Sequence, residues 1–146
     1  AVVTQPPKKR KKRSKTVTQS PVGQLALELN LPLLTPIKAN SKVFLNQLAT
    51  DASVERGPND DHEEDLGPNV GPIDLCITAA YGQYLPKRFL ATPALGTVNI
   101  HPSLLPKWRG ASPVQRSLQA GDNPIGVTVL YTVSAMDAGP IVAQTT

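Results

Sequence analysis

The second half of the chain alternates short apolar runs with helix-start signals, and this alternation limits the folds open to it. Near-continuous apolar segments predict strands at 73–80, 97–101 and 126–131, the first of a kind buried on both faces. Helices are expected at Pro86 and at Ser112-Pro113, because serine caps a helix and proline suits its first position. Strands separated by helices favour parallel pairing. We therefore expect an α/β, Rossmann-like domain with a mostly parallel sheet flanked by helices.

The first half shows weaker signals of the same kind. Ser20-Pro21 is expected to open a helix that ends near Asn30, because its apolar residues fall on one stripe. These residues are Val22, Leu25, Ala26 and Leu29. Leu33-Leu34 is expected to form a short strand, and 41–49 a second helix. That second helix is expected to bury Phe44, Leu45 and Leu48.

Charge is distributed unevenly. The net charge is +4, but seven of the 15 basic residues lie between Lys8 and Lys15 and seven of the 11 acidic residues between Asp51 and Asp65. Because like charges this dense repel, the basic run is expected to stay extended unless a partner orders it. The acidic run is poor in apolar residues, which predicts a disordered surface insertion at about 50–72.

Several function classes are disfavoured by what the sequence lacks. No run approaches the roughly 18 apolar residues of a membrane helix, so no membrane association is expected. Cys76 is the only cysteine, which leaves no disulfide framework, and we expect it to be a core residue. No spacing of ligand residues indicates a metal site, and His62 is expected to be a solvated surface residue.

Asn99 and His101 stand out as candidates for chemistry. They are two residues apart on the expected 97–101 strand, so their side chains project to the same face. Pro102 ends the strand after them, which places both near its carboxyl end, where ligands bind in such sheets. The spacing alone leaves two interpretations open, a functional site and a strand end that meets water. The proline-restricted loop that follows, with Leu104-Leu105, favours a binding site for a flat heteroaromatic ligand. Packing of Leu104 and Leu105 beneath the loop is the alternative, and composition alone does not decide between the two.

The residues from this strand onward resemble a known family signature. The ordered set is Asn99-Ile100-His101-Pro102-Ser103-Leu104-Leu105-Pro106, then Arg109-Gly110 and Asp137-Ala138-Gly139. It is similar to the signature of the formyltransferases that use 10-formyltetrahydrofolate. The resemblance implies a catalytic trio of Asn99, His101 and Asp137. It also implies folate contacts from Ser103, Leu104, Leu105 and Pro106, and from Tyr81 and Gly82 within the similar segment 79–86.

Within the family, the chain resembles the branch that formylates methionyl-tRNA. The segment 110–116 followed by 126–128 fits this branch better than the branch that acts on glycinamide ribonucleotide. The order of Thr4-Gln5-Pro6, the basic loop and Ser20-Pro21-Val22 fits it as well. The resemblance implies initiator methionyl-tRNA as partner, folate as cosubstrate and action as a monomer. It places the basic loop 4–19 in the acceptor-end site, with tRNA contacts from Arg10, Lys12, Arg13 and Lys15.

The chain also departs from the family pattern. It begins and ends in strand-like sequence without an initial Met, so we expect a partial catalytic domain over 1–146, truncated at both ends. The family's first strand and its C-terminal β-barrel domain are expected to be absent. The basic loop lacks the glycines usual in the branch. Formylated initiator tRNA implies a mitochondrion or plastid in a eukaryote, or the cytoplasm of a bacterium.

The implied reaction is attack of an amino group on a formyl carbon. Asn99 can donate to the developing oxyanion, and His101 can take the amine proton or donate to that oxygen. Asp137 would orient the imidazole, and no metal is required because the donor is already activated. Two alternatives remain, a formyltransferase for a small amine such as glycinamide ribonucleotide and a non-catalytic RNA-binding fragment.

Overall fold

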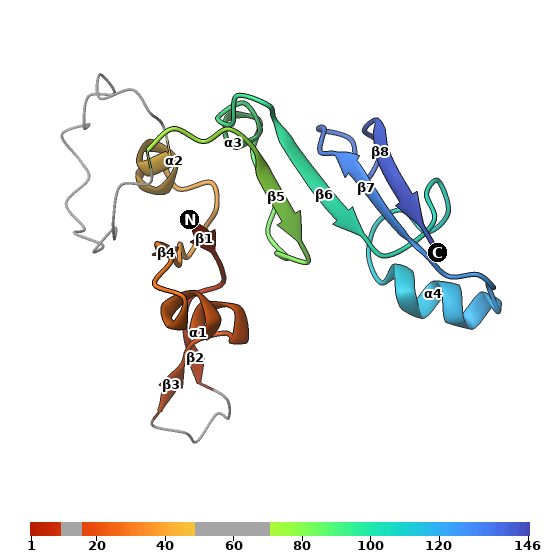
Figure 1. Cartoon of the computed structure of the whole chain (residues 1–146), viewed down its shortest axis with the longest axis horizontal. Helices are drawn as coiled ribbons and strands as arrows, with labels where there is room; N and C mark the ends of the chain where they lie inside the picture. Colours follow the sequence, from red (N-terminus) through yellow and green to blue (C-terminus); the bar gives the residue numbers. More distant parts are fainter. Residues whose placement is uncertain (10–15, 49–70) are drawn as a thin grey trace. The chain divides into compact units, whose positions relative to one another are not determined.

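A computed structural model describes residues 1–9, 16–48 and 71–146. The chain divides into two compact units (Figure 1). The first comprises Ala1–Ile73 with Gln83–Leu85, and the second Asp74–Gly82 with Pro86–Thr146. The acidic segment at about 50–72 lies almost wholly outside the described residues, as do positions 10–15 of the basic loop.

The first unit holds two small sheets and two helices. Strand β1 (Val2–Val3) pairs in parallel with β4 (Leu33–Leu34), and β2 (Lys8–Lys9) pairs antiparallel with β3 (Val17–Thr18). Because β2 and β3 pair antiparallel, the base of the basic loop is a short hairpin. Lys8 and Lys9 are exposed on it. The helices are α1 (Pro21–Glu28) and α2 (Lys42–Leu48).

Both helices of this unit follow the sequence signals. Ser20 caps α1, because its Oγ accepts a hydrogen bond from the Gly23 backbone N at 3.0 Å. The α1 stripe is mostly exposed, however, and only Ala26 of its four residues is buried. The predicted burial in α2 is confirmed for Phe44, Leu45 and Leu48.

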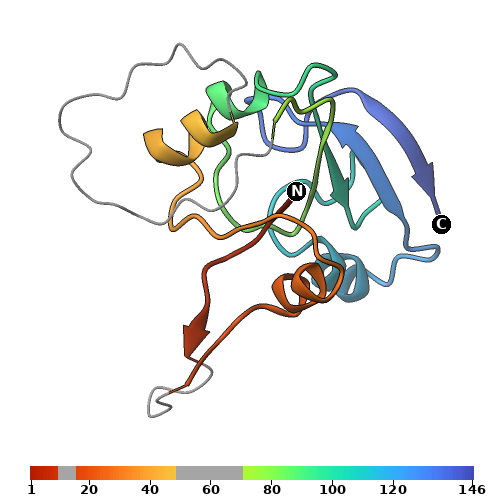
Figure 2. The ribbon, with the colours of Figure 1, turned by 60° about the vertical axis from the view of Figure 1, so that its left-hand side comes forward.

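The second unit is a four-stranded sheet in the order β5-β6-β7-β8. Its strands are β5 (Cys76–Ala79), β6 (Thr97–His101), β7 (Val127–Tyr131) and β8 (Ile141–Thr145). Helix α3 (Lys87–Leu90) lies between β5 and β6 in the chain, and α4 (Pro113–Ala120) between β6 and β7. Figure 2 shows β7 and β8 side by side in blue. Each expected strand and helix of this half is therefore present.

The α/β class is confirmed, but this sheet is less parallel than predicted. β5 and β6 pair in parallel, whereas β6–β7 and β7–β8 pair antiparallel. His101 at the end of β6 lies opposite Thr128 at the start of β7. The connection through α4 therefore leaves and returns at the same end of β6, which reverses the next strand. A helix between two strands does not by itself make a parallel crossover.

The prediction that 73–80 is buried on both faces is wrong. β5 alternates between half-buried Cys76 and Thr78 and exposed Ile77 and Ala79, and Ile77 is 63% exposed. Within the part of the chain that the structure describes, β5 pairs with β6 alone. It is thus an edge strand with one covered face, which explains the alternation.

Candidate active site

Asn99 lies in the middle of β6, opposite Thr78 of β5. The Thr78 Oγ1 donates to Asn99 Oδ1 at 2.9 Å and lies 3.1 Å from the Val98 carbonyl oxygen. Because the amide oxygen faces Thr78, the amide nitrogen points away from it. Among the described residues this nitrogen has no hydrogen-bond partner, so it can donate to a ligand.

His101 is the last residue of β6, and it is only 5% exposed. Its Nε2 lies 3.0 Å from the carbonyl oxygen of Trp108, and its Nδ1 lies 3.6 Å from Asp137 Oδ2. Both ring nitrogens therefore face acceptors. A neutral imidazole carries one N–H and can donate to only one of them, whereas a protonated imidazole can donate to both.

Asp137 reaches the imidazole from the segment that follows β7. The Thr132 backbone N donates to the Thr97 carbonyl at 2.8 Å, so this segment starts beside the beginning of β6 and reaches its end at His101. Asp137 Oδ2 also accepts a hydrogen bond from the Gly110 backbone N at 2.7 Å. The carboxylate therefore connects the segment after β7 with the loop after β6.

The last residue of the Asp137-Ala138-Gly139 motif must be glycine for a steric reason. A Cβ at Gly139 would overlap the main-chain carbonyl of Tyr131, where β7 ends. The two ends of the segment between β7 and β8 meet here, since the Tyr131 N donates to the Pro140 carbonyl at 2.9 Å. Close approach of two backbones is one of the uses that proteins make of glycine.

A buried polar network fixes the loop after β6. The Thr128 Oγ1 donates to the Ser103 carbonyl at 2.7 Å and accepts from the Leu105 N at 3.1 Å. The Gln144 Nε2 donates to Thr128 Oγ1 at 2.8 Å and to the Leu105 carbonyl at 2.9 Å. The Thr128 hydroxyl thus uses its donor and both acceptor positions. The backbone is held on both sides of Leu104.

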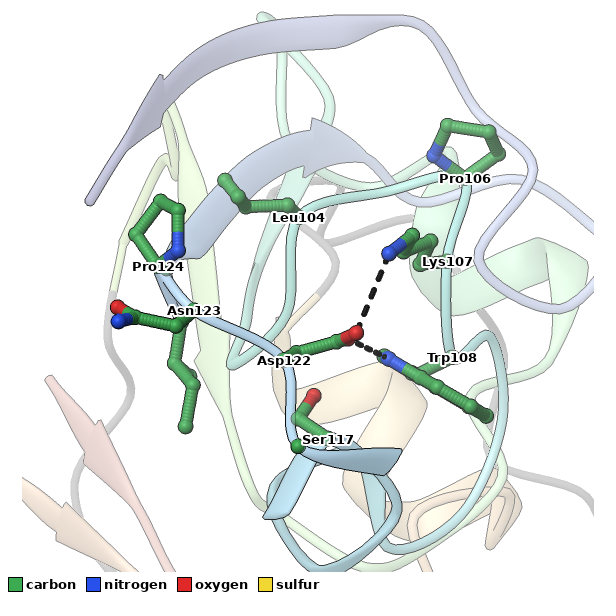
Figure 3. Close-up of a pocket in the computed structure, with 11 residues that line it drawn as sticks. Leu104, Pro106, Lys107, Trp108, Ser117, Asp122, Asn123 and Pro124 are labelled. Carbon is green, nitrogen blue, oxygen red and sulfur yellow. Dashed lines mark hydrogen bonds and ion pairs between the residues drawn. The ribbon is translucent and has the colours of Figure 1, made fainter. Parts of the chain in front are cut away.

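An open pocket of about 540 Å³ lies beside this loop (Figure 3). Its wall combines apolar side chains with a charged group, the Asp122 carboxylate, which accepts from Lys107 Nζ at 3.2 Å and from Trp108 Nε1. Hydrogen bonds from Trp108 and then from Lys107 hold the pKa of Asp122 below its usual value. Asn99, His101 and Asp137 do not line this pocket.

Comparison with known proteins assigns the chain to a family. The family described as Formyl transferase matches residues 1–146. The chain is a formyl transferase family member. It is 40% identical to a methionyl-tRNA formyltransferase of Limosilactobacillus fermentum and 42% identical to one of Lactobacillus johnsonii, each over 99% of this chain and 39% of the relative. It therefore spans about two fifths of the length of these curated relatives.

A similar solved structure supports the fold. A glycinamide ribonucleotide transformylase from Geobacillus kaustophilus is 28% identical, with a TM-score of 0.61 over 85% of this chain and 59% of that one. The Rossmann-like formyltransferase fold expected from the sequence is thereby confirmed as the class of this chain.

The folate-contact residues expected from the family signature differ in their surroundings. Leu104 and Pro106 line the pocket, whereas Ser103 is fully buried (0% exposed) and donates through Oγ to the Lys107 carbonyl at 2.7 Å. Leu105 is also buried. Ser103 and Leu105 therefore act within the loop, through its internal packing and hydrogen bonds.

The other expected site residues lie apart from the pocket or outside the described residues. Tyr81 and Gly82 follow β5 and do not line the pocket; burial raises the pKa of Tyr81, and Gly82 has a φ of +74°. The residues expected to contact tRNA lie outside the described part of the chain: Arg10, Lys12, Arg13 and Lys15.

Sequence reasoning missed four supporting residues. These are Thr78, Asp122, Thr128 and Gln144, which hold Asn99, Trp108 or the loop 102–110. A signal existed for three of them, because each is a polar residue inside an apolar strand-like run and needs a partner when buried. Asp122 gave no such signal, since an acidic residue after a helix is ordinary.

Among the residues that the structure describes, no group of three or more His, Cys, Asp or Glu side chains is placed to hold a metal ion. Within the same ranges, no helix has the length and apolar character needed to cross a membrane.

Proposed function

We propose that the full protein carrying this chain transfers a formyl group from 10-formyltetrahydrofolate to the amino group of initiator methionyl-tRNA. The observation that carries the proposal is the pairing of His101 with Asp137 beside Asn99, at one strand end of a formyl transferase family member. The similarity to methionyl-tRNA formyltransferases favours this acceptor.

In the proposed reaction the α-amino nitrogen attacks the formyl carbon and forms a new C–N bond. The resulting tetrahedral intermediate collapses, the bond from the formyl carbon to the folate nitrogen breaks, and that nitrogen takes up a proton. Asn99 donates its free amide N–H to the developing oxyanion, a contact typically worth about 10²–10³ in rate. His101 takes the proton of the attacking amine or donates to the oxyanion.

Asp137 has two roles in this proposal. Its carboxylate faces His101 Nδ1 and favours the orientation in which the ring can transfer a proton. Its hydrogen bond from the Gly110 N keeps the carboxylate in place. Because both nitrogens of His101 already face protein acceptors, a reacting atom must replace one of them, and the Trp108 carbonyl is the neutral partner of the two.

The folate cosubstrate is proposed to contact the loop at Leu104 and Pro106, which present apolar surface to the pocket. Ser103 and Leu105 support that surface from within. Tyr81 and Gly82 remain proposed contacts on the strength of the family resemblance. No residue is assigned to a metal ion.

The tRNA is proposed to bind the basic loop 4–19 through Arg10, Lys12, Arg13 and Lys15. Closely spaced phosphates of an acceptor stem suit so dense a run of cations, and the affinity should fall steeply with salt. We propose a monomer that acts in protein synthesis, in a bacterial cytoplasm or in a mitochondrion or plastid.

The acceptor is tested by supplying the full protein with 10-formyltetrahydrofolate and either methionyl-tRNA or glycinamide ribonucleotide. Formylation of the tRNA is expected. Transfer only to the small amine would overturn the proposal in favour of the second candidate, which the similarity to the Geobacillus kaustophilus glycinamide ribonucleotide transformylase supports. RNA binding without transfer to either acceptor would instead identify a binding protein.

The loop is tested by changing Arg10, Lys12, Arg13 and Lys15 together to Gln. The tRNA affinity should fall and its dependence on salt should flatten, because fewer counterions are released. A matched control removes the same charge elsewhere, at Lys38, Lys42, Arg88 and Arg116. Equal loss in both variants would show that net charge, and not the loop, attracts the tRNA.

A further inference from the structure

Trp108 has a backbone conformation that a bulky residue rarely adopts. Its φ is +60°, in the left-handed region that favours glycine. Such a conformation persists only where the surrounding structure holds it. The hydrogen bonds of Thr128, Gln144 and Ser103 fix the loop before Trp108, and the indole adds a contact at Trp108 itself, which is drawn in Figure 3.

The Asp122 carboxylate, which follows α4 in the chain, holds the Trp108 indole. Trp108 Nε1 donates to Asp122 Oδ2, and Lys107 Nζ donates to Asp122 Oδ1 at 3.2 Å. The Asp122 side chain is 19% exposed and the Lys107 side chain 66%, so the indole contact is the more sheltered of the two. A hydrogen bond to a charged acceptor is stronger than one between neutral groups.

The main chain at Trp108 contacts the imidazole of the proposed site. With φ at +60°, the Trp108 carbonyl oxygen lies 3.0 Å from His101 Nε2. Two residues later, the Gly110 N donates to the Asp137 carboxylate, which faces His101 Nδ1. The short segment 108–110 therefore positions a group on each side of the same ring.

We propose that Asp122 is a positioning residue for His101, because its hold on the Trp108 indole keeps the Trp108 carbonyl on the imidazole. That carbonyl competes with Asp137 for the one proton of a neutral imidazole. The contact at Asp122 thus sets which ring nitrogen carries the proton. The effect on the ring stands on geometry alone, and its consequence for formyl transfer rests on the proposed function.

Four variants test the proposal. Asp122→Leu removes the acceptor, and Trp108→Phe removes the indole donor but keeps an aromatic ring. Asp122→Asn keeps an oxygen that can accept from the indole, and Lys107→Met removes only the exposed cation. We expect the first two to disturb His101 and the last two to leave it close to the parent protein.

The chain offers a direct readout for each end of this arrangement. Trp108 is its only tryptophan, so acrylamide quenching of fluorescence reports release of the indole. It contains two histidines, His62 and His101, so ¹⁵N chemical shifts show which His101 nitrogen is protonated once His62→Gln assigns the signals. Asp122→Leu should raise quenching and move the His101 shifts, and Trp108→Phe should move those shifts in the same direction.

Unchanged His101 shifts in a folded Asp122→Leu protein whose tryptophan is released would overturn the proposal. If circular dichroism shows that Asp122→Leu does not fold, unchanged shifts in Trp108→Phe decide against it in the same way. Formyl transfer is measured separately. The Trp108 carbonyl holds the ring in the orientation from which the reacting atom then replaces it at Nε2, so kcat should fall roughly 10- to 100-fold in Asp122→Leu with KM for methionyl-tRNA nearly constant. If the His101 shifts move in the variants but the parent protein transfers no formyl group, the positioning role stands and the proposed function is overturned.

Discussion

Two segments hold His101, and they are built differently. The loop 102–110 after β6 is fixed by buried hydrogen bonds from Thr128 and Gln144 to its main chain. The segment 132–140 after β7 supplies Asp137 but exposes much of its surface, and Met136 is 73% exposed. One side of the imidazole therefore rests on a packed loop and the other on a segment at the surface.

The difference indicates an order of dependence. Asp137 accepts a hydrogen bond from Gly110, so the surface segment takes part of its position from the packed loop. The packed loop has its own anchors in β7 and β8 and needs none from Asp137. Substitutions that disrupt the loop 102–110 should therefore disturb the contacts on both sides of the His101 ring, whereas a substitution at Asp137 should leave the loop intact.

The largest expected effect comes from Asp137→Asn in the full protein. The amide keeps an oxygen for the Gly110 N but lacks the charge that faces His101 Nδ1. Formyl transfer should fall by roughly 10²–10⁴-fold, since general acid–base catalysis by the ring depends on that carboxylate. Single-turnover formylation of methionyl-tRNA measures the change.

Affinity for tRNA should stay nearly constant in Asp137→Asn. The matched control is Asp74→Asn, the same substitution at an exposed position, which should transfer at the parent rate. Equal losses of binding and transfer would show that Asp137 is structural. They would also contradict the independence of the packed loop.

An intermediate effect is expected from Thr128→Val, which keeps the shape of the side chain and removes the hydroxyl. Its partners at Ser103, Leu105 and Gln144 would lose that contact in a buried place. Each buried group left unsatisfied costs about 1–3 kcal/mol, so the free energy of unfolding should fall by about 3 kcal/mol in urea denaturation.

The same substitution at Thr132 is the control for Thr128→Val. The Thr132 Oγ1 is buried and has no hydrogen-bond partner among the described residues, so Thr132→Val should cost nothing or stabilise slightly. A similar loss of stability in both variants would show that the cost comes from fitting a second methyl group, and not from losing the hydrogen bonds of Thr128.

The sequence predicted the elements of the second unit well, because each apolar run has capping residues or prolines at its borders. The 97–101 strand matches the structure, and α4 begins at Pro113 as expected. Ser112, however, makes no capping hydrogen bond through its side chain and has a φ of 58°, so the expected serine cap is absent there. Pairing directions were harder. They depend on where a connection returns, and the return of β7 beside His101 has no local signal in the chain.

The candidate site was predictable where spacing sets geometry. The pair Asn99 and His101 shares a strand face by periodicity, whereas the approach of Asp137 required the family resemblance, since 36 positions separate it from His101. The groups that orient these side chains could not be predicted from the sequence. Trp108 contacts His101 through its carbonyl oxygen, and every residue has a carbonyl, so residue type could not reveal that contact.

The smallest expected effect concerns Thr78, which sets the direction of the Asn99 amide. Thr78→Val removes the hydroxyl that donates to Asn99 Oδ1, so the amide can turn and present its oxygen to the oxyanion. We expect kcat to fall about 10-fold with KM nearly constant, a fraction of the loss from removing such a donor outright. Thr78→Ser keeps the hydroxyl and should restore most of the rate, while both variants unfold at similar urea concentrations. A rate loss that serine does not repair would show that the Thr78 methyl, and not its hydroxyl, supports the site.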